Sequence, residues 1–115
     1  MSQPEMIVAL DVPNAAEMRS TLERMPDSIG WYKVGLELFC SEGPSVLAPL
    51  QKQNKSIFLD LKLHDIPRTV GNAVKTAAEH GVNLMTVHAV GGRAMMEEAA
   101  EAAASCQCPP KLVAV

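Results

Sequence analysis

The chain has 115 residues, of which 48% are hydrophobic and 20% charged, and its formal net charge is −3 at pH 7. This mixture is typical of one small globular domain and argues against a disordered chain. The charges form no basic stripe, which argues against a nucleic-acid partner. The apolar run that ends before Asp11 is too short for a signal peptide or a membrane span, so we expect a cytoplasmic protein.

Five short apolar, β-branched segments predict β-strands, and they cover residues 6–10, 31–36, 56–61, 83–87 and 111–115. Their first residues recur every 25 to 28 positions, which is the length of one βα unit. The strands are apolar on both faces, as in a parallel sheet that is covered by helices. The pattern therefore predicts an α/β fold with a parallel sheet.

The first two connecting segments predict helices of unequal quality. Asn14 is a good N-cap residue with Glu17 three positions later, and Pro26 ends the helical pattern. The next helix has a good start at residues 41–44, but Pro49 falls inside it, where proline costs about 3 kcal/mol. We therefore expect the second helix to be kinked or to start late.

The third and fourth segments predict amphipathic helices. The third begins near Pro67, terminates at Gly81 and carries apolar residues at helical spacing, namely Val70, Ala73, Val74, Ala77 and Ala78. The fourth covers residues 93–105, and its apolar stripe consists of Met95, Met96, Ala99, Ala100 and Ala103. The loop after it contains Cys106 and Cys108, which together with Cys40 have neither disulfide nor zinc-finger spacing, so we expect free thiols and no metal.

Four βα units and a fifth strand, uninterrupted by a linker, predict a single domain over residues 1–115. The pattern alone allows an open doubly wound sheet or half of an eight-fold (β/α)₈ TIM barrel. Polar residues at the ends of several strands favour the barrel, whose active sites lie at the carboxyl ends of the strands; these residues are Asp11, Lys33, Asp60, Lys62 and His88. An open-sheet nucleotide binder is disfavoured because no glycine-rich turn follows the first strand.

The segment from Asp60 to Asp65 contains the strongest chemical signal. The strand period of two places Asp60 and Lys62 on one face, and Asp65 follows in the loop. Carboxylates on both sides of a lysine favour its protonated form, which suits a proton donor and not a Schiff-base nucleophile. Such an ammonium fits a reaction in which a carboxylate leaves as carbon dioxide and the resulting carbanion is protonated.

The alternative is an ordinary ion pair at a strand end, with the Asp65 carboxylate only stabilising the positive N-terminus of the following helix. On pattern alone the two interpretations have about equal weight. Asp11 and Lys33 favour the functional one, because a second carboxylate and a second ammonium at the ends of two other strands are difficult to explain as solvated surface.

Four segments of the chain resemble the bacterial orotidine 5′-monophosphate decarboxylases in order and spacing. They are Ile7-Val8-Ala9-Leu10-Asp11, Lys33-Val34-Gly35-Leu36-Glu37, Asp60-Leu61-Lys62-Leu63-His64-Asp65-Ile66-Pro67 and Val87-His88-Ala89. The combination of Asp-x-Lys-x-x-Asp with Ile-Pro-x-Thr is more specific than any of its parts. The resemblance implies a (β/α)₈ barrel that converts orotidine 5′-monophosphate to uridine 5′-monophosphate, as a homodimer and without metal or organic cofactor.

The same resemblance implies roles for individual residues. Lys62 would protonate the ring carbanion, Asp60 would lie against the substrate carboxylate, and Asp65 would reach in from the partner subunit. The remaining substrate-binding residues that it implies are Asp11 and Lys33 at the ribose hydroxyls, with Lys33 also in the charge network, and Ile66 and Thr69 at the dimer interface.

The family's barrel needs about twice this length. We therefore expect this chain to be the N-terminal half of a barrel, which alone would be inactive and prone to associate through open sheet edges. Two alternatives have a similar fold. One is a magnesium-dependent phosphosugar decarboxylase or synthase of the same superfamily, and the other is a non-catalytic half-barrel that assembles with a second copy.

Overall fold

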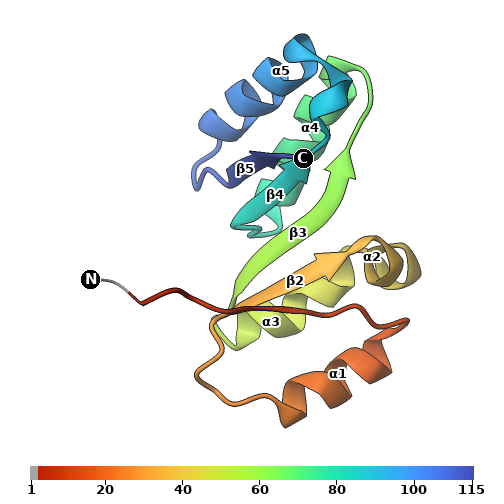
Figure 1. Ribbon diagram of the computed structural model, residues 1–115, viewed down its shortest axis with the longest axis vertical. Coiled ribbons are helices and arrows are strands. Elements are labelled where there is room, and N and C mark those ends of the chain that lie inside the picture. The colour runs from red at the N-terminus through yellow and green to blue at the C-terminus, as the bar shows by residue number, and fades with distance from the viewer. Residues whose placement is uncertain (1–2) are drawn as a thin grey trace. The chain divides into compact units, whose positions relative to one another are not determined.

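The computed structural model describes residues 3–115, and its helices and strands alternate along the chain (Figure 1). The elements are β1 (Ile7–Ala9), α1 (Ala15–Arg24), β2 (Trp31–Gly35), α2 (Leu36–Glu42), the 3₁₀ helix η1 (Gly43–Leu47), α3 (Ala48–Lys52), β3 (Ser56–Leu63), α4 (Pro67–Glu79), β4 (Leu84–Val87), the 3₁₀ helix η2 (Ala89–Gly91), α5 (Arg93–Ala104) and β5 (Lys111–Ala114). They form two compact units that meet in the sequence between Phe58 and Leu59, inside β3.

The strands are hydrogen-bonded in sequence order, β1-β2-β3-β4-β5, as the predicted succession of βα units requires. In the first unit β1 pairs with β2 in parallel, with Ile7 opposite Trp31. In the second unit β4 pairs with β5 in parallel, with Leu84 opposite Lys111. Both outer strands carry exposed apolar side chains: Ile7 is 40% exposed and Val113 is 46% exposed.

Helix α1 forms where its capping residues predict. The Asn14 side chain accepts a hydrogen bond from the amide of Glu17 at 2.9 Å, which confirms the predicted N-cap. A second amide at this helix start, the part-buried one of Ala15, donates to the Glu42 carboxylate at 2.8 Å. Glu42 is the last residue of α2, so this bond fastens two helices of the first unit to each other.

The second helix is interrupted, one of its two expected outcomes. Helix α2 begins at Leu36, directly after β2, so the other expected outcome, a late start, does not occur. The expected break is present, because the segment divides into α2, η1 and α3. Pro44 and Pro49 lie in the first turns of η1 and α3, where the missing N–H removes no helical hydrogen bond.

Helices α4 and α5 pack against each other in the second unit. The buried residues of α4 are Val70, Gly71, Val74 and Ala77, close to the predicted stripe. In α5 the predicted Met95, Ala99 and Ala103 are buried and Ala102 joins them, whereas Ala100 is exposed. Helix α4 ends at Glu79, and Gly81 follows with a φ of 80°, a left-handed conformation that glycine adopts without strain.

The single tyrosine of the chain, Tyr32, supports a prediction about alkaline pH. Its side chain is buried on β2, and burial, followed by the charge of Asp27, raises the pKa of its phenol above the usual value of about 10. The unfolded state therefore ionises first, so Tyr32 causes no loss of stability below about pH 10 and a progressive loss above it.

Urea unfolding of wild-type and Tyr32→Phe protein from about pH 8 to about pH 11 measures this effect. We expect the stability of the wild type to fall more steeply above about pH 10 than that of the variant. Tyrosinate absorbance follows the same group directly. Parallel stability curves for the two proteins would contradict the prediction.

Candidate active site

The second unit holds a close ion pair at the carboxyl end of β3. The Lys62 ammonium donates hydrogen bonds to both oxygens of Asp60, at 2.9 Å to Oδ1 and 3.0 Å to Oδ2. The Asp60 side chain is 11% exposed and that of Lys62 is 45% exposed. The two residues therefore lie side by side, as the strand period predicts, with a mostly buried carboxylate and an ammonium that is open to a ligand.

Lys62 has an unusual backbone conformation. Its φ is 49°, in the left-handed region that costs a residue with a side chain about 1–3 kcal/mol. Its amide donates to the side-chain hydroxyl of Thr86, on β4, at 2.9 Å. The regular ladder is restored after it, where the amide of His88 donates to the carbonyl of Leu63 at 2.9 Å.

Thr86 is a buried polar residue in an otherwise apolar strand, with 3% of its surface exposed. Its hydroxyl donates to Asp60 Oδ1 at 2.8 Å. In the sequence Thr86 stands out only as one β-branched residue of a predicted strand. A hydroxyl between Met85 and Val87 in a buried strand is the signal that could have identified it, because buried polar groups need partners.

The first unit contains a second pair of opposite charges. Lys33 Nζ on β2 lies 3.5 Å from Asp11 Oδ1, two residues beyond the end of β1. The Lys33 side chain is 23% exposed and that of Asp11 is 66% exposed. Both residues lie at or near the carboxyl ends of neighbouring parallel strands, as expected for residues that bind a substrate at that edge.

The loop and helix after β3 carry the other three candidate residues, and all of them are exposed. Asp65 Oδ1 accepts a hydrogen bond from the amide of Ile66 at 2.7 Å. Ile66 is 64% exposed, and Thr69 is exposed in the first turn of α4. Within the described residues Lys62 pairs with Asp60, and the expected carboxylate of Asp65 on its other side stays a prediction.

His88 lies at the end of β4 and interacts with its own loop. Its Nδ1 accepts a long hydrogen bond of 3.4 Å from the amide of Val90, inside η2. Its ring lies 5.3 Å from that of His64, measured between centroids. His88 therefore contacts its own loop, whereas the ion pair is formed by Asp60 and Lys62.

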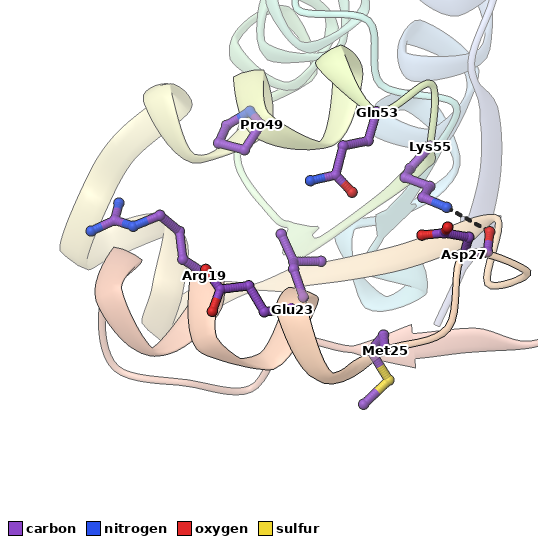
Figure 2. Close-up of a pocket in the computed structure, with 8 residues that line it drawn as sticks. Arg19, Glu23, Met25, Asp27, Pro49, Gln53 and Lys55 are labelled. Carbon is purple, nitrogen blue, oxygen red and sulfur yellow. Dashed lines mark hydrogen bonds between the residues drawn. The ribbon is translucent and has the colours of Figure 1, made fainter.

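A cavity of about 700 Å³ lies in the first unit, and none of the candidate residues named above lines it (Figure 2). Its walls come from the end of α1, the turn before β2 and the segment before β3, where Lys55 donates to the carbonyl of Asp27 at 2.9 Å. These segments precede the amino ends of β2 and β3, the opposite end from Lys33. In barrels that end contributes stability and not catalysis, so we place no active site there.

The described part of the chain holds no cluster of three or more histidine, cysteine or acidic side chains arranged to bind a metal ion. Cys40 and Cys108 are exposed free thiols, and Cys106 donates weakly to the carbonyl of Ala102 at 3.2 Å. Among residues 3–115, no helix has both the length and the apolar character needed to span a bilayer.

Comparison with known proteins identifies the family. Residues 4–115 match the model of the orotidine 5′-phosphate decarboxylase / HUMPS family. The chain belongs to this family. It is 47% identical over its full length to an orotidine 5′-phosphate decarboxylase of Gloeothece citriformis and 48% identical over 120 aligned positions to that of a Nostoc species. It spans about half the length of these curated relatives, 49% and 50%.

Solved structures of the orotidine 5′-phosphate decarboxylase family have the same fold. A crystal structure of the Lactobacillus acidophilus decarboxylase superposes with a TM-score of 0.87 at 39% identity, covering 97% of this chain and 52% of that one. A more distant structure from Methanocaldococcus jannaschii, at 24% identity, has a TM-score of 0.86. These neighbours are TIM barrels, so the expected barrel fold is confirmed over about half of its length.

Proposed function

We propose that the protein carrying this chain decarboxylates orotidine 5′-monophosphate to uridine 5′-monophosphate, as a carboxy-lyase of pyrimidine synthesis located in the cytoplasm. The observation that carries the proposal is the Lys62–Asp60 pair at the carboxyl end of β3, in a chain whose curated relatives are named for this activity. The combination of Asp-x-Lys-x-x-Asp with Ile-Pro-x-Thr is also the most specific part of the resemblance.

The proposed chemistry uses the pair as follows. The bond between the pyrimidine ring and its carboxylate breaks, carbon dioxide leaves, and the electron pair stays on the ring carbon. The Lys62 ammonium stabilises this negative charge and then delivers a proton to the ring carbon, after which solvent reprotonates the amine. The Asp60 carboxylate faces the substrate carboxylate and holds the ammonium in place, since the two are in direct contact.

The other residues have binding roles in this proposal. Asp11 and Lys33 hold the ribose hydroxyls, and Lys33 also contributes charge to the site. Asp65, Ile66 and Thr69 act at a homodimer interface, and their exposure in this chain supports a partner there. We further propose that this chain is the N-terminal half of the barrel and that additional strands complete it, which would cover the exposed Val113 and Val115.

No metal or organic cofactor has a role in this chemistry, because an ammonium supplies both the charge stabilisation and the proton. The second candidate is a magnesium-dependent phosphosugar decarboxylase or synthase, and the family description that includes HUMPS favours it as the alternative. The two candidates differ in substrate and in their need for a metal.

A turnover assay separates them. The protein that carries this chain, with every segment encoded with it, should convert orotidine 5′-monophosphate to uridine 5′-monophosphate at an unchanged rate after treatment with a chelator. Residues 1–115 alone should show no turnover, because half of a barrel leaves the site incomplete. Activity that disappears with chelator and returns with Mg²⁺, or turnover of phosphosugars alone, would favour the second candidate.

A further inference from the structure

The Thr86 hydroxyl lies between the backbone amide of Lys62 and the side chain of Asp60. Its oxygen lies 2.9 Å from the amide nitrogen of Lys62 and 2.8 Å from Asp60 Oδ1. Thr86 is the buried polar residue of the described core. A hydroxyl has one hydrogen to donate, and its oxygen accepts through two lone pairs.

The direction of both hydrogen bonds follows from the chemistry of the partners. The amide of Lys62 can only donate, so the Thr86 oxygen accepts from it. The ionised carboxylate of Asp60 can only accept, so the single hydroxyl proton goes to Oδ1. The two bonds therefore fix the orientation of the Thr86 hydroxyl, which connects the backbone of Lys62 to the side chain of Asp60.

The bond to Lys62 also explains how the strained backbone persists. At a φ of 49° the backbone of Lys62 departs from the extended conformation of a regular strand. The Thr86 hydroxyl accepts from its amide in a part-buried place, where an unsatisfied amide would be costly. The Thr86 side chain thus fixes the backbone conformation from which the Lys62 ammonium reaches the Asp60 carboxylate.

We propose that Thr86 is a positioning residue for the decarboxylation, which holds the Asp60 carboxylate ionised and oriented and holds Lys62 in its left-handed conformation. This inference rests on the proposed function for its kinetic consequences. It does not make Thr86 a catalytic residue, because its buried hydroxyl is used by Asp60 and Lys62 and has no proton left for a substrate.

The test compares Thr86→Val, which keeps the shape and removes the hydroxyl, with Thr86→Ser, which keeps the hydroxyl. Because a hydrogen bond to a charged group is lost, we expect Thr86→Val to lower kcat about 10- to 100-fold with KM changed less than about threefold. Thr86→Ser should stay within about threefold of wild type. Thr76→Val is the matched control, because the Thr76 hydroxyl only donates to the carbonyl of Asn72 on the exposed face of α4.

The pH dependence distinguishes positioning from general structural support. A lost hydrogen bond to the ionised carboxylate raises the pKa of Asp60, so the acid limb of the kcat profile should move to higher pH in Thr86→Val and not in Thr86→Ser. An unchanged profile, wild-type kcat in Thr86→Val, or an equal loss in Thr86→Ser would overturn the proposal. If Thr86→Val does not fold, Thr86→Ala replaces it, because the smaller side chain leaves room for a water.

A failure of the proposed function would be visible separately. In that case the wild-type protein would not turn over orotidine 5′-monophosphate at all. Thr86 would then be judged by NMR titration of the Asp60 carboxyl carbon in wild-type and Thr86→Val protein. A higher titration midpoint in the variant would support the positioning role, and identical midpoints would refute it.

Discussion

Replacing Lys62 with alanine should abolish the decarboxylation while the protein stays folded. The ammonium is the proposed proton donor and the charge that stabilises the carbanion, so we expect a loss of about 10³-fold or more in kcat. Its stem is half exposed and fills no core space, so truncation should leave the fold intact. The measurement is steady-state turnover of orotidine 5′-monophosphate, together with urea unfolding of the same preparation.

Lys75→Ala is the matched control for this experiment. Lys75 is another lysine of the second unit, exposed on α4, and its truncation should change neither turnover nor stability. If Lys62→Ala kept activity within about tenfold of wild type, Lys62 would not be the general acid, and the assignment of the reaction to this ion pair would be wrong.

Two inactive variants should restore each other's activity when they are combined. Within this chain Asp65 is exposed and is not in ion-pair contact with Lys62, whereas the resemblance places Asp65 in the site of the partner subunit. In a mixed dimer of Lys62→Ala and Asp65→Ala subunits, one of the two sites would then receive an intact Lys62 from one subunit and an intact Asp65 from the other. The second site would carry both substitutions.

Each variant alone should be nearly inactive, and a refolded equimolar mixture should regain about one quarter of wild-type activity, since random pairing gives half mixed dimers with one intact site each. The control mixes Lys62→Ala with Thr86→Val, because the Thr86 hydroxyl bonds to the Lys62 amide of its own chain, so every site of a mixed dimer keeps one of the two substitutions. A mixture of Lys62→Ala and Asp65→Ala that stays inactive would show that Asp65 acts within its own subunit, or that no shared site exists.

Much of the fold follows from local patterns. The period of about 25 to 28 residues locates all five strands, and the Asn14 cap and the stripe of α4 locate two helices. The errors fall where tertiary context competes with local preference. Pro49 was expected to kink the second helix or delay its start; the segment is interrupted as expected, but it forms three short helices, and Pro49 lies in the first turn of the last. Ala100 was expected in the core, but Ala102 is buried in its place.

The candidate site, too, could be predicted only in part. The alternation of side chains along a strand is a local property, so it is sufficient to place Asp60 beside Lys62, and the structure confirms that contact. The Asp11–Lys33 contact also follows, because the ends of neighbouring parallel strands lie at one edge. Thr86 was missed because its significance depends on which residue lies opposite it on the next strand, and no local pattern contains that information.

The segment from Asp60 to Asp65 by itself therefore predicts the chemistry, because it holds a carboxylate and an ammonium at a spacing that favours proton donation to a carbanion. The tertiary structure alone decided how that pair is held. The left-handed backbone of Lys62 and the buried hydroxyl that satisfies its amide arise from the pairing of β3 with β4, across 24 residues of sequence. Charges near one another in sequence can be recognised from their spacing, whereas a partner for a buried amide exists only once the strands have paired.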